Sequence, residues 1–361
     1  MTATTTAPSG IANSLTTGRL PKWAPWATLA GSWVVVGGIL GLMAAGSGGE
    51  FNIAVALVLG TVLFNIAIFV LTYLVEGVRQ AKDRVVTSLV ASAFIIALIP
   101  LVSLLYTVII NGAARFDLQF FSSSMRNVVG EGGGALHAIV GTLLITGMAT
   151  LISVPVGLLT AIYLVEYGRG HLARAITFFV DVMTGIPSIV AGLFAFAFFA
   201  LIFDDPGIRF GFGGSIALSL LMIPVVVRSS EEMLKLVPNE LREASYALGV
   251  PKWLTILKIV IPTSIAGITT GVTLAIARVI GETAPLLIIS GFTASMNYDL
   301  FKDRMASLPV FLYTQYQNPG SDVQPYLDRA WAGALTLILI VMALNLIARL
   351  VARIFSPKLG R

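Results

Sequence analysis

The chain has 361 residues, of which 57% are hydrophobic and 11% are charged, and its net charge is +5. Because about a quarter of the residues in a soluble domain are charged, this composition excludes an ordinary soluble protein and indicates an integral membrane protein. The chain contains no cysteine, which excludes disulfide bonds and thiolate metal sites. Its basic residues are dispersed between apolar runs, so we expect no nucleic-acid binding.

Eight apolar runs are long enough to cross a membrane, which requires about 20 such residues. They lie at 24–45, 52–75, 85–110, 136–165, 175–203, 214–235, 260–290 and 330–352. The sequence therefore predicts an all-α integral membrane protein. Its expected parts are a disordered cytoplasmic tail at 1–23, an accessory transmembrane hairpin at 24–84, a core of six transmembrane helices at 85–355, and a cytoplasmic tail at 356–361.

The distribution of basic residues predicts the orientation of these spans, because cytoplasmic loops hold the excess of Lys and Arg. With the N-terminus inside, 16 of the 23 basic residues lie on the cytoplasmic side and six on the outer side. The remaining one, Arg278, lies within a span. Both termini are therefore expected in the cytoplasm, and the spans are expected to contact membrane lipid.

The fifth span contains a signal for an interrupted helix. Gly185 and Pro187 lie inside its apolar run, and such a break is tolerated where the freed backbone groups face protein or a wet cavity. Asp181, about two turns from the cytoplasmic end, and Ser188 lie beside it. We interpret Asp181, Pro187 and Ser188 either as part of a transport pathway or as a kink in which Asp181 bonds to backbone or to nearby basic side chains.

Residues 238–262 form a polar helical hairpin between apolar runs. Pro238 can begin a helix, since its missing N–H would have no partner there, and Gly249 can end it in the left-handed conformation. Pro251 would begin a second short helix, and Pro262 lies where that helix should end or bend into the next span. The predicted orientation places this hairpin in the cytoplasm.

The spacing of residues within the hairpin resembles a known sequence motif. Glu243, Ala244 and Ser245 are followed after three residues by Gly249 and after nine more by Ile259–Pro262. This pattern resembles the EAA motif of ABC importer permeases, where it forms a coupling loop that docks on the ATPase. The resemblance implies that Glu243, Ala244, Ser245 and Gly249 couple this chain to such a partner. The alternative is an ordinary interfacial hairpin.

The seventh span contains two charged residues close together in the sequence. Arg278 and Glu282 are four residues apart, hence expected on one helical face, and they are followed by Thr283 and by Pro285. A charge within the bilayer costs at least about 2.5 kcal/mol, so it should face a pore or a partner. We interpret the pair either as a mutually satisfied buried salt bridge or as a transient anion site with Glu282 as the resting counter-ion. A guanidinium suits a tetrahedral oxyanion.

The chain has no sign of its own catalytic or metal chemistry. No glycine is followed by lysine, so the phosphate-binding loop of an ATPase is absent, and any ATP chemistry belongs to a partner. The two histidines, His137 and His171, are far apart and lack metal-ligand spacing. We expect no catalytic residues, no metal site and no cofactor in this chain.

Three longer sequence segments make the resemblance to ABC importer permeases more specific. Residues 276–287 (IARVIGETAPLL), 181–190 (DVMTGIPSIV) and 241–249 (LREASYALG) are similar to the PstA family, the permease subunits of bacterial phosphate ABC importers. The similarity covers about 85–355. Departures are the extra N-terminal pair of spans and Ser245 in place of the second alanine of the motif.

This resemblance implies a non-catalytic subunit in the bacterial plasma membrane. It would form half of a phosphate pathway, containing Arg278, Glu282 and Thr283, beside a PstC-like permease, a PstB-like ATPase dimer that binds ATP and Mg, and a PstS-like phosphate-binding protein. Two alternatives remain. One is an ABC permease for another oxyanion, such as molybdate or sulfate, and the other is a stand-alone secondary transporter or channel, which would have no use for the hairpin.

Overall fold

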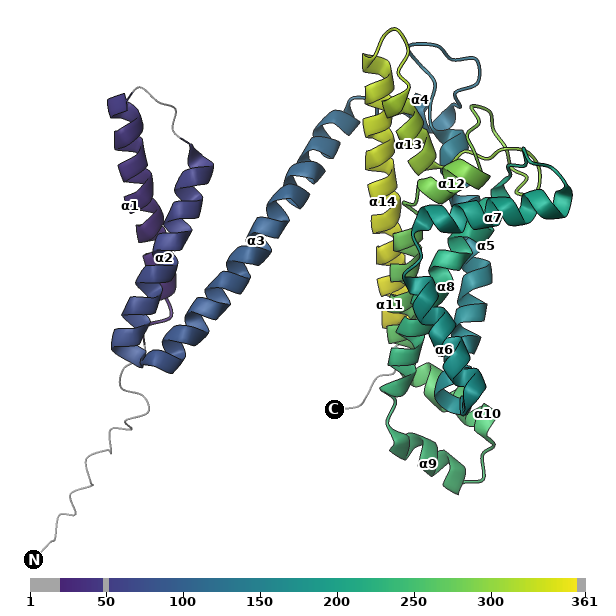
Figure 1. Cartoon of the computed structure of the whole chain (residues 1–361), viewed down its shortest axis with the longest axis horizontal. Helices are drawn as coiled ribbons and strands as arrows, with labels where there is room; N and C mark the ends of the chain where they lie inside the picture. The colour runs from purple at the N-terminus through teal and green to yellow at the C-terminus, as the bar shows by residue number, and fades with distance from the viewer. Residues whose placement is uncertain (1–19, 48–51, 356–361) are drawn as a thin grey trace, which may run out of the picture. The chain divides into compact units, whose positions relative to one another are not determined.

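The computed structural model of the chain describes residues 20–47 and 52–355 (Figure 1). Every regular element within these ranges is a helix. Seven helices are long and apolar enough to cross a membrane, and one bent pair makes an eighth if it forms a single span. The predicted all-α membrane fold is therefore confirmed, and helices cover all eight predicted spans. The predicted tails, apart from residues 20–23, lie outside the described residues.

The first of two compact units extends to Leu105 and contains a helical hairpin. Helix α1, Ala24–Ser47, packs against α2, Ile53–Glu76. The two approach closely because a side chain at Gly60 would overlap Trp33, whose indole N–H donates to the Thr61 hydroxyl at 3.2 Å. The hairpin lies within residues 24–84, and its role as an accessory unit stays a prediction.

Helix α3, Val78–Ala113, starts earlier than the expected span at 85–110 and continues from the first unit into the second. At about 1.5 Å per residue, its 36 residues exceed the length needed to cross a bilayer. The basic residue Arg84 lies in its first turns and pairs with Glu76 at 2.9 Å. The predicted division between 84 and 85 thus lies within a continuous helix, and as a domain boundary it stays a prediction.

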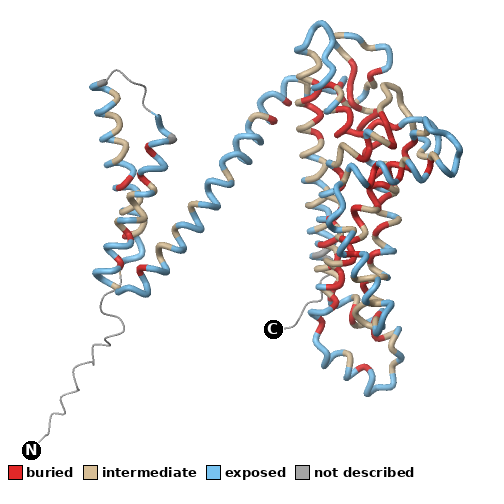
Figure 2. Tube along the Cα trace, in the orientation of Figure 1, coloured by how far each residue is buried: buried red, intermediate tan, exposed pale blue. Residues whose placement is uncertain are grey.

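The second unit is built around α5, Leu136–Ile162, and α8, Gly211–Lys235. Small residues allow these helices to approach: the Ser215 hydroxyl donates to the Ile145 carbonyl at 3.0 Å, and a side chain at Gly157 would overlap Val226. Figure 2 shows the buried residues of this unit, in red, where its helices meet. The main cluster includes residues of these two helices and of the seventh span: Ile145, Leu218, Met222, Val226, Val279 and Leu286.

Two helices of this unit are interrupted. Helices α6, His171–Thr184, and α7, Ser188–Phe203, meet at an angle of 110° at the predicted break. The seventh span, expected as one run over 260–290, is divided into α11, Ile261–Val279, and α12, Ala284–Ile289. The two interrupted helices touch where Gly192 meets Pro285, since a Cβ at Gly192 would lie 2.5 Å from the Pro285 Cα.

Two short helices, α4, Leu118–Ser122, and α13, Leu308–Gln317, lie at one end of the second unit. The long α14, Gln324–Phe355, begins at this end and runs along the unit. Arg329 on α14 is fully buried and ties this end together, donating to the Gln315 side chain at 2.9 Å and to the Gly130 and Gly132 carbonyls at 2.7 and 3.0 Å.

Candidate functional site

The hairpin predicted at 238–262 is present as two short helices joined by a tight turn. Helix α9, Asn239–Ala247, follows Pro238 directly, and α10, Lys252–Thr255, follows Pro251. Gly249 in the turn has a φ of +74°, a left-handed value that strains other residues. In Figure 1, α9 and α13 lie at opposite ends of the second unit.

The four predicted coupling residues divide into a surface group and an internal contact. Glu243, Ala244 and Gly249 are exposed, whereas Ser245 is buried. The Ser245 hydroxyl lies 2.7 Å from that of Thr255 and so joins the two helices of the hairpin. The serine that departs from the family pattern therefore holds the hairpin together from inside.

The exposed face of the hairpin is also apolar. Leu241 and Tyr246 are each 41% exposed and Leu248 is 83% exposed. Large exposed apolar side chains on a polar loop are typical of interaction sites. Glu243 is exposed on the same short helix and has no side-chain partner within the described residues.

Arg242 attaches the hairpin to the membrane helices. Its guanidinium pairs with Glu166 at 2.9 Å and donates to the Val237 and Leu234 carbonyls at 2.6 and 3.0 Å. Only 12% of the Arg242 side chain and 5% of the Glu166 side chain are exposed. Lys252, from the second helix of the hairpin, donates to the Glu166 carbonyl. Both helices of the hairpin are thus bonded to Glu166.

Glu166 lies in a π-helical turn, η1, Tyr163–Tyr167, that continues α5. A second such turn, η2, Ile256–Val260, joins α10 to α11. The second helix of the hairpin therefore does not end at Pro262 but continues to Val279. Pro262 cannot donate to the carbonyl four residues earlier, and the wider turn before it accommodates this loss, since the Ile261 N–H donates to the Ile256 carbonyl.

Arg278 lies in the last turn of α11, and Glu282 and Thr283 lie in the break before α12. Arg278 is exposed, while Glu282 and Thr283 are partly buried. Within the described residues, no salt bridge joins Arg278 to Glu282. The expectation that the two share a helical face is wrong, because the helix ends at Val279 and the four-residue spacing no longer places them together.

Asp181 pairs with Arg228 of α8. Arg228 also pairs with Glu231 at 2.8 Å, and Glu231 pairs with Lys235 at 2.7 Å, so four charges form one chain between α6 and α8. This agrees with the interpretation in which Asp181 bonds to a nearby basic side chain. Pro187 and Ser188 begin α7 just beyond the bend, as a kink requires.

Sequence reasoning missed the attachment of the hairpin. Glu166 and Arg242 are 76 residues apart, and Asp181 and Arg228 are 47 apart. Each is an ordinary charge at a predicted cytoplasmic end, and no local pattern indicates its partner. The one available signal was the occurrence of Glu166 just after the apolar run of span four and of Asp181 within that of span five.

Comparisons of the sequence with known proteins agree on one family. Residues 153–361 match the family described as binding-protein-dependent transport system inner membrane component. The phosphate transport system permease protein PstA 1 of Mycobacterium tuberculosis (strain CDC 1551 / Oshkosh) is 49% identical over 276 residues, covering 76% of this chain and 89% of that protein. PstA of Yersinia pestis is 39% identical over 281 residues, covering 78% and 92%. The inward-facing MetNI methionine ABC transporter matches with a TM-score of 0.48 at 18% identity, covering 62% of this chain and 95% of that one.

Proposed function

Because the chain belongs to the PstA family of phosphate transport permeases, we propose that it forms half of the pathway through which an ATP-driven importer carries phosphate into a bacterial cell. The observation that supports this most directly is the continuous helical run from Lys252 to Val279. It connects the hairpin at one end to Arg278, which has no salt bridge among the described residues, at the other. Movement of a docked partner can therefore reach a basic group inside the membrane.

The importer is an ABC transporter complex, in which this chain contributes the membrane pathway and an ATPase supplies the energy. We assign the ATPase to a PstB-like dimer that binds ATP and Mg, the second permease to a PstC-like chain, and the external phosphate-binding protein to a PstS-like chain. This chain has no catalytic residues and no cofactor of its own in this scheme. The absence of a Gly-Lys pair in its sequence supports this division of labour.

The proposed pathway passes the break between α11 and α12. Arg278 is exposed there and lies at the carbonyl end of α11, whose dipole favours a cation. A guanidinium can donate two parallel hydrogen bonds to the oxygens of a phosphate ion. Glu282 and Thr283 lie in the same break, where Glu282 can repel the anion onward and Thr283 can donate through its hydroxyl.

The predicted positive-inside orientation indicates on which side of the membrane the hairpin, the termini and α13 lie. The hairpin and both termini lie in the cytoplasm of a bacterium, and the end of the second unit that carries α13 faces outward. The accessory hairpin of α1 and α2 precedes this core in the same plasma membrane. A cysteine placed at Arg169, which is exposed on the predicted cytoplasmic side and lies outside the hairpin, is expected to be labelled in intact cells only by a membrane-permeant reagent.

The substrate is tested by uptake into vesicles that hold the purified four-component complex and ATP. We expect radiolabelled phosphate to accumulate and an excess of sulfate or molybdate to leave the rate unchanged, since the proposed site recognises the particular oxyanion delivered by the binding protein. Uptake of molybdate or sulfate at the expense of phosphate would assign the chain to another oxyanion.

Replacing Glu243 tests the docking face. We expect Glu243→Ala to lower ATP-driven uptake about tenfold and to reduce the amount of ATPase that co-purifies in mild detergent, because the carboxylate makes a charge-assisted bond at a partly apolar interface. Glu131→Ala, which removes an exposed carboxylate on the predicted outer side, provides the matched control. Full uptake and full co-purification with Glu243→Ala would remove the hairpin from the interface.

A further inference from the structure

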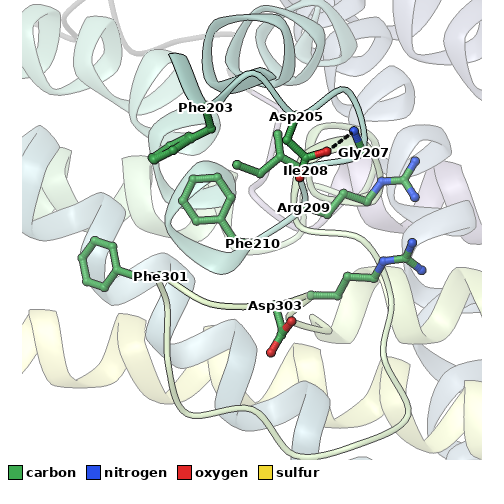
Figure 3. A pocket seen from close by; sticks show the side chains of 9 residues that line it. Phe203, Asp205, Gly207, Ile208, Arg209, Phe210, Phe301 and Asp303 are labelled. Atoms are coloured by element: carbon green, nitrogen blue, oxygen red, sulfur yellow. Dashed lines mark hydrogen bonds between the residues drawn. The ribbon is translucent and has the colours of Figure 1, made fainter. Parts of the chain in front are cut away.

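A pocket of about 480 Å³ lies between the segment that joins α7 to α8 and the segment that follows α12. Both segments are on the predicted outer side. Figure 3 shows the side chains around it. Three aromatic rings form one part of its wall, and two arginines, two aspartates, a glycine and an isoleucine form the rest. The lining residues are Phe203, Phe210, Phe301, Arg209, Arg304, Asp205, Asp303, Gly207 and Ile208.

The two arginines run side by side across Gly291. This glycine is buried and has a φ of +71°. A methyl group on it would lie 3.0 Å from Cδ of Arg209 and 3.4 Å from Cδ of Arg304. Both side chains therefore cross the same point of the backbone, and the absence of a Cβ there allows them to do so. The Nε of Arg209 is also fixed, since it donates to the Ile288 carbonyl at 3.1 Å.

Within the part of the chain that the structure describes, neither arginine has a counter-ion, since no carboxylate pairs with Arg209 or Arg304. The Asp205 carboxylate accepts the Gly207 N–H at 2.8 Å, and in Figure 3 the Asp303 carboxylate points away from the Arg209 guanidinium. Two cations held together without an anion repel each other, so an anion that lies between them lowers the energy of the pocket.

We propose that Arg209 and Arg304 bind a phosphate ion on the outer side of the chain, before it reaches Arg278. The choice of phosphate rests on the proposed function. Each guanidinium presents a planar fork of N–H donors, and two such forks can hold several oxygens of one tetrahedral ion. The pocket also lies within the size range of small-molecule sites, about 300–1,000 Å³.

The short helix α12 connects this pocket with the proposed pathway. Its first residue, Ala284, follows Glu282 and Thr283 closely, and its last turn carries the Ile288 carbonyl that holds Arg209. Six helical residues span only about 9 Å. An ion released from the two arginines is therefore one short helix away from the break that follows Arg278.

The two aspartates favour a small ion over a larger acidic partner. Asp205 and Asp303 lie on the wall of the same pocket and are exposed. A broad acidic protein surface would bring its carboxylates close to both of them, and like charges at an interface are unfavourable. A single phosphate ion can contact the guanidinium groups without contacting either carboxylate.

Protection from arginine modification tests the site directly. The purified complex, without the binding protein, is treated with phenylglyoxal, and modified positions are found by peptide mass spectrometry. We expect inorganic phosphate to slow modification of Arg209 and Arg304 several-fold and to leave Arg126 unaffected. Arg126 is an exposed arginine on the predicted outer side, outside the pocket, and so is a matched internal control.

Three results would overturn the assignment. Equal modification with and without phosphate would show that the pair binds no phosphate. Protection by the external binding protein, with none from phosphate alone, would make the pocket a protein-docking surface. Protection that depends on anionic lipid, with none from added phosphate, would make it a lipid site.

Uptake measurements separate this inference from the proposed function. We expect the double variant Arg209→Gln with Arg304→Gln to lower the initial rate of phosphate uptake about tenfold while the ATPase still co-purifies. Arg126→Gln is expected to transport normally, and Arg209→Lys with Arg304→Lys to fall between, since it keeps the charge and loses the planar fork. If the unmodified complex takes up no phosphate, the proposed function fails. If it does and the double variant matches it, only the outer site fails.

Discussion

Phosphate uptake by an importer that carries Arg278→Ala is expected to fall at least about a hundredfold, although the complex still assembles. Without the exposed guanidinium in the last turn of α11, the pathway would lose two charge-assisted bonds to the passing ion, each contributing roughly 1.5–3 kcal/mol. Assembly should persist, because Arg278 makes no salt bridge within the described residues. The measurement is ATP-driven accumulation of radiolabelled phosphate in vesicles.

Arg278→Lys distinguishes charge from geometry at the same position. It keeps the positive charge but cannot form the planar bidentate contact, so uptake should recover only in part. Co-purification of the ATPase reports assembly in each variant. Uptake near the unmodified level with Arg278→Ala, in a complex that has assembled, would place the pathway elsewhere in the chain.

Breaking the attachment of the hairpin should uncouple ATP hydrolysis from transport. Removing one partner of a buried ion pair costs about 3–5 kcal/mol, and Arg242 and Glu166 are both nearly buried. In Arg242→Ala, the Glu166 carboxylate and the Leu234 and Val237 carbonyls all lose a donor. We expect the ATPase to continue hydrolysing ATP while phosphate uptake falls at least about tenfold, since movement of the hairpin no longer reaches the membrane helices.

Two further variants make this result specific. Glu166→Ala should reproduce it from the other side of the pair, and the double variant should be little worse than either single one, because the two residues act through one contact. Arg349→Ala, which removes an exposed basic residue near the predicted cytoplasmic end of α14, is expected to transport normally. Coupled uptake at the normal rate in Arg242→Ala would contradict a mechanical role for the pair.

The features that could be predicted from the sequence are those that one segment determines by itself. Apolar length predicts the spans, because the bilayer sets a minimum length. Proline and glycine predict the breaks, because they restrict or free the backbone locally: Pro187 marks the bend before α7, and Gly249 adopts the left-handed conformation that its position in the hairpin requires.

The rest depends on where distant segments meet. The spacing of Arg278 and Glu282 suggested a pair only on the assumption of an unbroken helix, and the helix ends between them. The partners of Arg242 and Arg228 lie on other helices, so charge type alone could not identify them. The adjacency of Arg209 and Arg304 depends on a third residue, Gly291, over which both side chains run.

Gly192 allows the two interrupted helices to approach closely at Pro285, because glycine has no Cβ. Glycine presents a hydrogen where any other residue would place a methylene or methyl group 2.5 Å from the proline Cα. Even alanine would wedge α7 away from α12. The helix after the bend beside Asp181 and the helix after the break beside Arg278 thus meet at this contact, although the two interruptions lie nearly a hundred residues apart in the chain. The space between the two helices there is too small for a single methyl group.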